Sequence, residues 1–336
     1  MGESDRLVAA AGTIEALVNL DFTERGVIRA LHGAACERFE GPLCHTAARR
    51  ILDAVPDGGG VTFLTGFPEF PWIDRGIPET DGPVGAAVLA RSLIKVRRAI
   101  PRFPCERHFA GAIEAAIRGM GLSPVRSDRA APRPGDPVCV VDVVDGPVDA
   151  EAWLARHRPS LVLAIERPGR SATGTYHSMS GTKITHCLEN LEDLFLAAGR
   201  GTLTVAIGDG GNEVGMGVLR DVVEHCVPNG KACGCGCGGG IAARSEAAVL
   251  VTSVVANLGA SAIAASLALL TGQREALPSV ELEMRALAAC AAAGAVDGQH
   301  NECVASADGL GAPAYAAVLE TIAALVDRPL GRVRDR

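Results

Sequence analysis

Residues 203–213 read LTVAIGDGGNE, an apolar run of strand length that breaks directly into a glycine-rich turn with three polar side chains. Short apolar runs bounded by turn residues are typical of buried strands. Glycine costs backbone entropy, so three glycines in one turn indicate positive φ angles or a ligand close to the main chain. Because open α/β sheets bind ligands at the carboxyl ends of their strands, Asp209 and Glu213 become candidate functional residues.

The rest of the chain predicts the sheet to which this strand belongs. Of the 336 residues, 48% are hydrophobic but only 4% are aromatic, so Ala, Val, Leu and Ile must form most of the core. Such a core suits parallel strands covered by helices. Strand-like runs at 61–64, 138–144, 161–165 and 249–252 alternate with helical patterns. We therefore expect an α/β fold with a mostly parallel, doubly wound sheet and helices on both faces.

The domain organisation is expected to be simple. Residues 1–55 have helical periodicity and are predicted to form an N-terminal helical segment packed on a main α/β domain of residues 56–336. The loop at 126–137 is the one plausible internal boundary. Residues 247–270 are apolar over a membrane-spanning length, but polar residues interrupt them. A buried strand, a turn at 257–259 and an Ala-rich helix account for this segment better.

Charge and cysteine content limit the partners and the compartment. The formal net charge of −7 argues against nucleic acid, which requires a basic footprint. The polar N-terminus does not resemble a signal peptide, and eleven cysteines without an export signal indicate reduced thiols. We expect a cytoplasmic protein that binds neither nucleic acid nor a membrane. The sequence leaves open whether the chain forms a homo-oligomer.

One cysteine cluster differs from the others. Cys233, Cys235 and Cys237 alternate with glycines, whereas zinc sites usually have Cys-x₂-Cys spacing. The sequence therefore favours a flexible glycine loop. Adventitious or regulatory metal binding is the alternative.

Four predicted strand ends carry polar or glycine residues suited to a site. They are Gly66 with the turn that contains Asp81, then Glu166, then the turn that begins at Asp209, and finally Asn257. In a parallel sheet these ends lie at one edge, so the residues are expected to meet in one cleft. Clustered carboxylates can hold a divalent cation, or can have separated pKa values and act as acid and base.

Structural roles compete with these functional ones. Asp81 and Asn257 are both suited to the start of a helix, and Glu213 would favour the positive end of a helix that follows it. Glu166 could form a structural ion pair with Arg167. These alternatives remain open from the sequence.

Familiar cofactor and nucleophile motifs are missing. The glycine turn lacks the Lys-Ser/Thr ending of a P-loop, and the chain has neither a dinucleotide fingerprint nor a Gly-x-Ser-x-Gly elbow. No nucleotide cofactor is therefore expected. His177, Ser178 and Ser180 fall in a polar segment, for which an exposed loop is the simpler interpretation and ligand contact the alternative.

Several short motifs resemble those of the D-glutamate cyclase C-terminal-like family, in the same order along the chain. They are TGF at 65–67, ETDGP at 79–83, IERPGR at 165–170, GDGGNE at 208–213 and GAVDG at 294–298. The animal members carry a hydro-lyase-like domain before this module, so the resemblance implies a stand-alone form. At 256–259 the chain reads ANLG where the family pattern is Ser-Asn-Trp-Gly, which removes a large aromatic from the edge of the expected pocket.

The resemblance implies a lyase that converts D-glutamate to 5-oxo-D-proline and water. Departure of a hydroxyl from a carboxylate needs an acid or a cation, so a divalent cation, Mg²⁺ or Mn²⁺, is the candidate cofactor. Chemical suitability assigns Asp209 and Glu213 to cation or amine binding, Glu166 to acid–base work and Asp81 to the substrate amine. Further residues at these positions are expected to bind substrate: Gly66, Gly210, Gly211, Asn212, Asn257 and Arg170.

Two other functions remain alternatives. The chain could be a metal-dependent enzyme for another small acidic, amino-acid-like substrate, or a non-catalytic module that binds an acidic ligand. A guanidinium in the pocket, for which Arg170 is the candidate, would favour a dicarboxylate substrate because its forked donors match a carboxylate.

Overall fold

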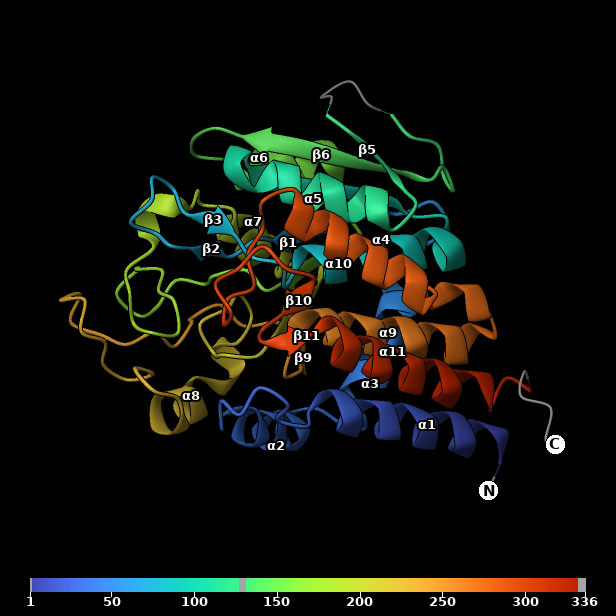
Figure 1. Ribbon diagram of the computed structural model, residues 1–336. Helices are drawn as coiled ribbons and strands as arrows, with labels where there is room; N and C mark the ends of the chain where they lie inside the picture. Colours follow the sequence, from blue (N-terminus) through green and yellow to red (C-terminus); the bar gives the residue numbers. More distant parts are fainter. Residues whose placement is uncertain (1, 127–130, 332–336) are drawn as a thin grey trace.

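The computed structural model describes residues 2–126 and 131–331, and a parallel sheet of seven strands lies at its centre (Figure 1). The strand order is β5–β6–β4–β1–β7–β8–β9. All neighbouring strands of this sheet run parallel, which confirms the α/β class. The strands are β1 (Gly60–Thr65), β4 (Ile100–Glu106), β5 (Ser123–Val125), β6 (Val138–Val144), β7 (Leu161–Ile165), β8 (Leu203–Gly208) and β9 (Val249–Thr252).

Helices cover both faces of this sheet, as expected for a doubly wound fold. From β1 the chain moves through α4 to β4, whereas from β6 it moves in the opposite direction through α6 to β7. Right-handed crossovers in opposite directions place their helices on opposite faces. One face holds α3 (Leu43–Ala54), α4 (Pro83–Arg97), α5 (Arg107–Gly119) and α9 (Ala256–Thr271), and the other holds α6 (Ala150–His157) and α7 (Glu192–Ala198).

Further helices form an outer layer over α5 and α9. α10 (Val280–Ala292) packs on α5, while α1 (Glu3–Val18) and α11 (Ala312–Asp327) pack on α9 and on each other (Figure 1). α2 (Ile28–Arg38) contacts β9 and α8 (Arg220–Cys226). Two small antiparallel hairpins are also present: β2 (Pro68–Glu69) with β3 (Ile77–Pro78), and β10 (Ser306–Ala307) with β11 (Leu310–Gly311). Three short 3₁₀ helices complete the described elements: η1 (Thr185–Cys187), η2 (Gly217–Leu219) and η3 (Arg274–Ala276).

The N-terminal helices share the main core. α1 and α3 contact α9, and α2 and α3 contact β9. Ile14, Leu31 and Ile51 are buried in the same hydrophobic cluster as the sheet residues. Of the boundary expected at 126–137, residues 127–130 lie outside the described part of the chain.

Strand β4 was missed by the sequence patterns because Pro101 and Pro104 interrupt the run, and helix α5 and strand β5, which follow it, were not predicted either. Proline lacks the N–H that a central strand normally donates. The ladder from β4 to β1 ends at Arg102, and the ladder to β6 begins there. Successive backbone nitrogens of a strand point to its two neighbours in turn, and the Ile100 nitrogen points to the β1 side. The Pro101 nitrogen therefore points to the β6 side and the Pro104 nitrogen to the β1 side, where in each case the ladder is missing.

Three other element predictions need correction. The turn expected at 257–259 comes earlier, because α9 already begins at Ala256. The helix expected directly after Glu213 comes later; the chain turns to Met216 and α8 starts only at Arg220. α11 and the β10–β11 hairpin were not predicted. Among the described residues, none of the helices combines the length and hydropathy that a membrane span requires.

The strand order places a topological switch point between β1 and β7. Strands added after β1 extend the sheet in one direction, and those from β7 onward extend it in the other. Open α/β sheets bind their ligands in the crevice at such a point, outside the carboxyl ends of the strands. The site is therefore to be sought beyond Thr65, Ile165 and Gly208.

Candidate functional site

Three buried carboxylates meet at this edge of the sheet. Asp81 lies in the turn before α4, Glu166 follows β7 directly, and Asp209 follows β8. One oxygen from each lies within 4.8 Å of the others. The residues are only 0%, 6% and 2% exposed. The convergence predicted from the strand ends is observed for these three residues.

Burial and repulsion between carboxylates raise the pKa values of Asp81 and Glu166. Burial, followed by the charge of Asp209, raises the pKa of Asp81 to about 7, although the backbone amides that it accepts oppose the shift. The same two causes, in the same order, raise the pKa of Glu166 well above its usual value. Repulsion of this kind falls when a cation binds, so the cluster is suited to a positively charged ligand.

Glu166 is strained and incompletely paired. Its φ angle is 44°, a left-handed conformation that a non-glycine residue adopts at a cost of roughly 1–3 kcal/mol. Its Oε2 atom is buried without a hydrogen-bond partner in the described structure. The alternative of a structural ion pair is wrong, because Arg167 binds Glu106 instead, through two contacts of 2.6 and 2.8 Å. Glu166 is therefore available for chemistry.

Asp81 and Asn257 cap each other's helices. The Asp81 carboxylate accepts the amides of Ala256 and Asn257, at 2.7 and 2.8 Å, at the start of α9. In return, Asn257 Oδ1 accepts the amides of Gly82 and Gly85, at 2.9 and 2.6 Å, at the start of α4. The expected caps are thus exchanged between the two helices. Asn257 is fully buried in this role and does not line the cavity described below.

Glu213 folds back onto its own turn. Its Oε1 accepts the amides of Asp209 and Gly210, both at 2.7 Å, so the Gly210 amide expected to bind substrate is already used. Burial, then repulsion from Asp209, raises the pKa of Glu213 to about 7. Its Oε2 is buried without a partner in the described structure. Glu213 is nevertheless not a member of the converging group, which consists of Asp81, Glu166 and Asp209.

Two glycines of the site are required by space as well as by φ. Gly66 has a φ of 110°, and an added Cβ would lie 2.9 Å from the ring of Phe109. Gly211 has a φ of 94°, and its Cβ would lie 2.5 Å from Val223. These glycines therefore shape the turns, which gives a structural role to residues expected to bind substrate.

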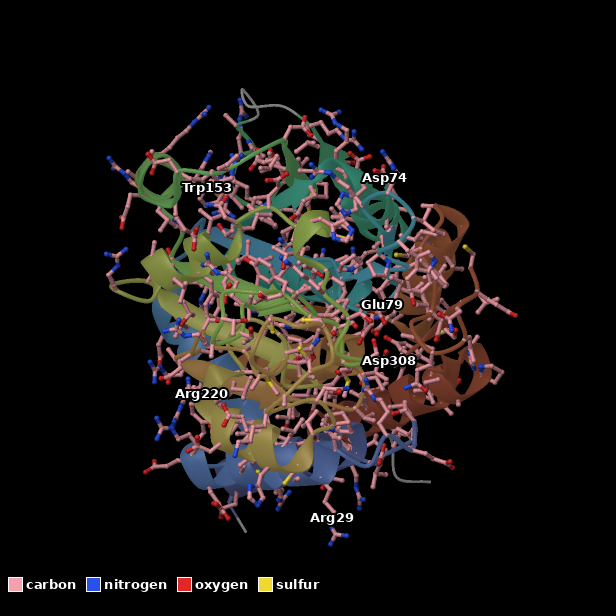
Figure 2. The ribbon with its side chains drawn as sticks, turned by 90° about the vertical axis from the view of Figure 1, so that its left-hand side faces the viewer. Arg29, Asp74, Glu79, Trp153, Arg220 and Asp308 are labelled. Atoms are coloured by element: carbon pink, nitrogen blue, oxygen red, sulfur yellow. The ribbon has the colours of Figure 1, made fainter. Side chains whose placement is uncertain are left out.

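A small acidic cavity of about 150 Å³ opens onto this cluster. It is well below the roughly 300–1,000 Å³ of sites for drug-sized ligands, so it suits a molecule of amino-acid size. Figure 2 shows Glu79 and Asp308 close together on this face. The cavity is lined by Arg25, Phe67, Glu69, Glu79, Glu166, Ser178, Met179, Asp209, Asn212, Gly298, Gln299 and Asp308.

The lining carboxylates extend the buried acidic cluster. Burial, then repulsion from Asp297, raises the pKa of Glu69 to about 7. Burial is also the main reason why the pKa values of Glu79 and Asp308 lie well above their usual range. Glu79 belongs to a motif that stands out in the sequence, but its role was not predicted; Glu69 and Asp308 have no local signal.

Arg25 supplies positive charge to the cavity. Its guanidinium lies 2.8 Å from Asp209 and 3.3 Å from Asp308, and it donates to the carbonyl of Val254 at 2.6 Å. Burial acts to lower its pKa, but the two carboxylates outweigh it and raise the pKa above the usual value. Arg25 lies in the connection between α1 and α2, where no motif marks a site residue.

Arg170, the arginine expected in the pocket, lies elsewhere. Its guanidinium pairs with Glu192 at 2.7 Å and also with Asp193 on α7. It borders a separate hollow and does not line the acidic cavity.

The loop that was expected to be exposed is exposed at Ser180, but other residues of it contribute to the wall of the cavity. Ser178 and Met179 line the cavity, and His177 is fully buried. The carbonyl of His177 accepts a hydrogen bond from the Asn212 side chain at 2.9 Å, which ties this loop to the glycine turn. Leu258, at the position of the expected aromatic, is buried in the core away from the cavity.

The GAVDG motif holds the far wall. Asp297 accepts amides from Gln299, His300 and Gly309, at 2.8 to 3.0 Å, and so fixes the loop that carries Asp308. Gly298 lies so close to Glu79 that an added Cβ would be 2.2 Å from its Oε1. The motif therefore shapes the cavity.

Comparison with known proteins identifies the family of this chain. The human protein named "D-glutamate cyclase, mitochondrial" is 27% identical over 269 residues, which cover 76% of this chain and 38% of the human protein. The chain thus spans well under half of the length of that relative. The family model described as "D-glutamate cyclase-like, C-terminal" matches residues 14–323, from α1 through most of α11. The chain therefore belongs to the D-glutamate cyclase-like, C-terminal family.

Proposed function

We propose that this chain is a lyase that cyclises D-glutamate to 5-oxo-D-proline and water. The observation that carries the proposal is the buried group of Asp81, Glu166 and Asp209, which opens onto a cavity of amino-acid size with Arg25 in its wall. The family, and the activity for which the human relative is named, support the choice of reaction.

The reaction needs a base, an acid and a folded substrate. The amine nitrogen forms a bond to the γ-carboxyl carbon, and the bond from that carbon to one carboxyl oxygen breaks. The nitrogen gives up protons, and the departing oxygen leaves as water. Binding the substrate with amine and γ-carboxyl in contact would supply much of the rate enhancement, because the reacting groups need not find each other.

Glu166 is the residue best placed to move the proton. Its buried Oε2 has no partner within the described structure. The ammonium group of the substrate would offset the repulsion from Asp209, lower the pKa of Glu166 and leave a carboxylate that accepts an amine proton. The protonated Glu166 can then donate to the departing oxygen. Asp81, whose oxygens accept the amides at the start of α9, has the role of positioning the carboxylate cluster.

The substrate carboxylates need positive charge in this acidic cavity. Arg25 lines it and is suited to a carboxylate because of its forked donors. Asp81, Glu166 and Asp209 also fit a divalent cation such as Mg²⁺ or Mn²⁺, since hard cations prefer carboxylate oxygens and Glu166 Oε2 is unpaired. Such a cation would polarise the γ-carboxyl group.

The alternative within the same chemistry is an enzyme for another small acidic substrate. A purely structural or ligand-holding role would have the carboxylates saturated by arginines and helix amides. Asp209 does pair with Arg25, and Asp81 does accept helix amides. Arg167 and Arg170, however, pair with other residues, and Glu166 Oε2 is left without a partner in the described structure. This arrangement favours catalysis over passive binding.

The test is to incubate the purified protein with D-glutamate or L-glutamate, with and without Mn²⁺, and to quantify 5-oxoproline by chiral chromatography. We expect the D product only, and its loss in Asp209→Asn. Asp145→Asn is the matched control, because Asp145 forms an exposed pair with Arg107 away from the cavity. Turnover of another acidic amino acid, with none of D-glutamate, would favour the alternative.

A further inference from the structure

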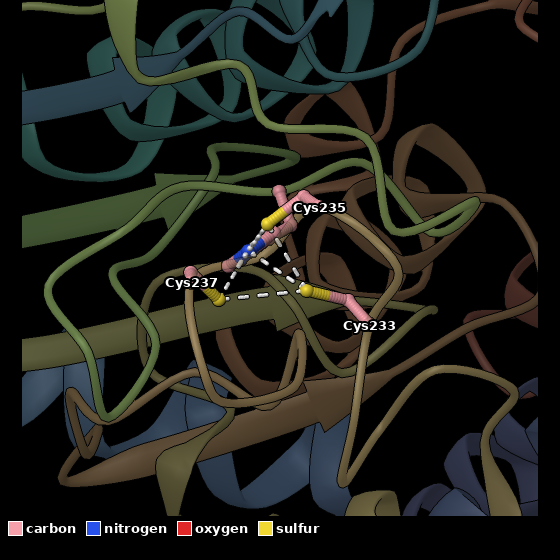
Figure 3. A group of neighbouring side chains, drawn as sticks. Cys233, Cys235 and Cys237 are labelled. Carbon is pink, nitrogen blue, oxygen red and sulfur yellow. Dashed lines mark hydrogen bonds between the residues drawn. The ribbon is translucent and has the colours of Figure 1, made fainter.

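The glycine loop that carries three cysteines is closed around a buried histidine. Figure 3 shows Cys233, Cys235 and Cys237 arranged around one imidazole ring. His177 Nε2 lies 3.5, 3.4 and 3.4 Å from their sulfurs, in that order. The Cys233 sulfur lies 3.1 Å from that of Cys235 and 3.5 Å from that of Cys237. All four candidate ligand atoms lie within 4.8 Å of one another.

We propose that Cys233, Cys235, Cys237 and His177 form a structural zinc site. Three thiolates and one imidazole are a standard tetrahedral zinc ligand set, and four protein ligands leave no open position for catalysis. A regular zinc tetrahedron places sulfurs about 3.8 Å apart and sulfur from nitrogen about 3.5 Å apart. The sulfur–nitrogen distances already match, and the sulfurs need to separate by a few tenths of an ångström.

A disulfide and a merely flexible loop both fit the cluster less well than zinc. A disulfide has its sulfurs about 2.05 Å apart, and the observed separations of 3.1 and 3.5 Å are well beyond that. His177 is fully buried, and its Nδ1 has no hydrogen-bond partner in the described structure, so the polar contacts of the ring lie on the sulfur side. A flexible loop would have no reason to gather three sulfurs on a histidine 56 residues away in sequence.

The backbone around the cluster is built for this closure. Gly236, between Cys235 and Cys237, and Gly238, directly after Cys237, have φ angles of 82° and 81°, which let the loop reverse at the cysteines. An added Cβ on Gly240 would lie 2.0 Å from the carbonyl of Gly230, so the two ends of the loop pack backbone to backbone. Alternating glycines thus replace the usual Cys-x₂-Cys turn. This is why the sequence spacing is atypical for zinc.

The proposed zinc site adjoins the wall of the acidic cavity. His177 is followed by Ser178 and Met179, both of which line that cavity. Asn229 donates to the Met179 carbonyl at 3.1 Å, and Asn212 donates to the His177 carbonyl at 2.9 Å. Zinc would therefore fix this wall. Hard carboxylates and soft thiolates would take up different cations, so the two sites are separate.

The test uses the full chain, purified under reducing conditions without chelator. Elemental analysis is expected to give about one zinc per chain, and the double variant Cys233→Ser, Cys237→Ser is expected to lose it. Cys303→Ser, at an exposed cysteine outside the cluster, and Glu166→Gln, in the acidic cavity, are expected to keep it. Retained zinc in the double variant would overturn the proposal.

Cobalt substitution in the wild-type chain provides a test that does not depend on variant folding. We expect the intense ligand-field and thiolate charge-transfer absorption of tetrahedral Co²⁺ bound by sulfur. Weak absorption typical of oxygen ligands, or no uptake of Zn²⁺ and Co²⁺ by the reduced chain, would contradict the zinc site. Neither result depends on cyclase activity, so this proposal and the proposed function can fail separately.

Discussion

Asp81, in the turn before α4, caps the start of α9, and Asn257, in the first turn of α9, caps the start of α4. Asp81 accepts two amides at the start of α9, and Asn257 accepts two at the start of α4. The exchange joins the two helices at the switch point and aims their positive ends toward the acidic cluster. Asp81 stays near Glu166 and Asp209 because the α9 amides hold its carboxylate there.

Asn257→Ala tests this exchange. The substitution leaves the Gly85 amide buried without its acceptor and removes the donor to the Thr80 carbonyl, while the Gly82 amide keeps Asp81 Oδ1 at 3.0 Å. We therefore expect the free energy of unfolding to fall by about 2–3 kcal/mol. Urea denaturation measures the change. Ser279→Ala removes an ordinary exposed cap of α10 and is expected to cost about 1 kcal/mol. Equal losses of unfolding free energy in the two variants would show that the exchanged cap stabilises the fold no more than an ordinary exposed cap.

Glu166→Gln separates activity from stability. We expect no detectable cyclisation, because the proposed proton carrier is lost. At pH 8 we expect the free energy of unfolding to rise by about 1 kcal/mol, because one repulsive buried carboxylate is removed at a site kept for function. The product assay and thermal denaturation give the two values. Wild-type turnover in this variant would remove Glu166 from the mechanism.

Arg25→Lys tests the guanidinium in the cavity wall. A lysine ammonium lacks the forked donors with which Arg25 reaches Asp209, Asp308 and the Val254 carbonyl. We expect KM for D-glutamate to rise at least about tenfold, equivalent to about 1.4 kcal/mol of substrate binding. Arg29→Lys, at an exposed position on the next helix, is the control. An unchanged KM would assign the substrate carboxylate to another group.

Glu283 offers a pH test outside the cavity. It is buried beside Ser261 and Tyr315, and burial raises its pKa from 4.5 to about 7 although both hydroxyls donate to it. The folded chain therefore binds a proton that the unfolded chain loses. The free energy of unfolding should fall between about pH 4.5 and pH 7, by about 3 kcal/mol from this group.

Glu283→Gln is expected to remove that part of the pH dependence. Urea denaturation at about pH 5 and about pH 8 should show a smaller loss of stability in the variant than in the wild type. Glu320→Gln, at an exposed position on α11, should leave the wild-type difference unchanged. Parallel pH profiles for wild type and Glu283→Gln would mean that Glu283 is already ionised in the folded protein.

Local patterns were sufficient to predict five of the seven strands and the convergence of the three carboxylates. The apolar runs at β1, β6, β7, β8 and β9 have strand length and end in turn residues, and parallel topology brings those ends together. β4 was not predicted because its prolines are incompatible with an ordinary central strand. Prediction thus succeeded where one hydrophobic pattern or one topology rule determines the backbone.

Long-range pairing could not be predicted in this way. Arg25 reaches Asp209 across 184 residues, and Asp308 comes from a loop positioned by Asp297. Arg170 was expected in the pocket, but nothing local revealed that Glu192 would bind it. The three cysteines were visible, but their fourth neighbour, a histidine from a distant loop, became apparent only when the fold brought the two loops together. Such contacts depend on the whole fold.

The acidic cavity at the switch point is proposed to cyclise D-glutamate, and one titration tests this most directly. It follows 5-oxo-D-proline formation from D-glutamate against Mn²⁺ concentration, in the wild type and in Glu166→Gln. We predict saturable, Mn²⁺-stimulated formation of the D product by the wild type and none by the variant. Folded wild-type protein that forms no product at any Mn²⁺ concentration, or equal product from both proteins, would contradict this function.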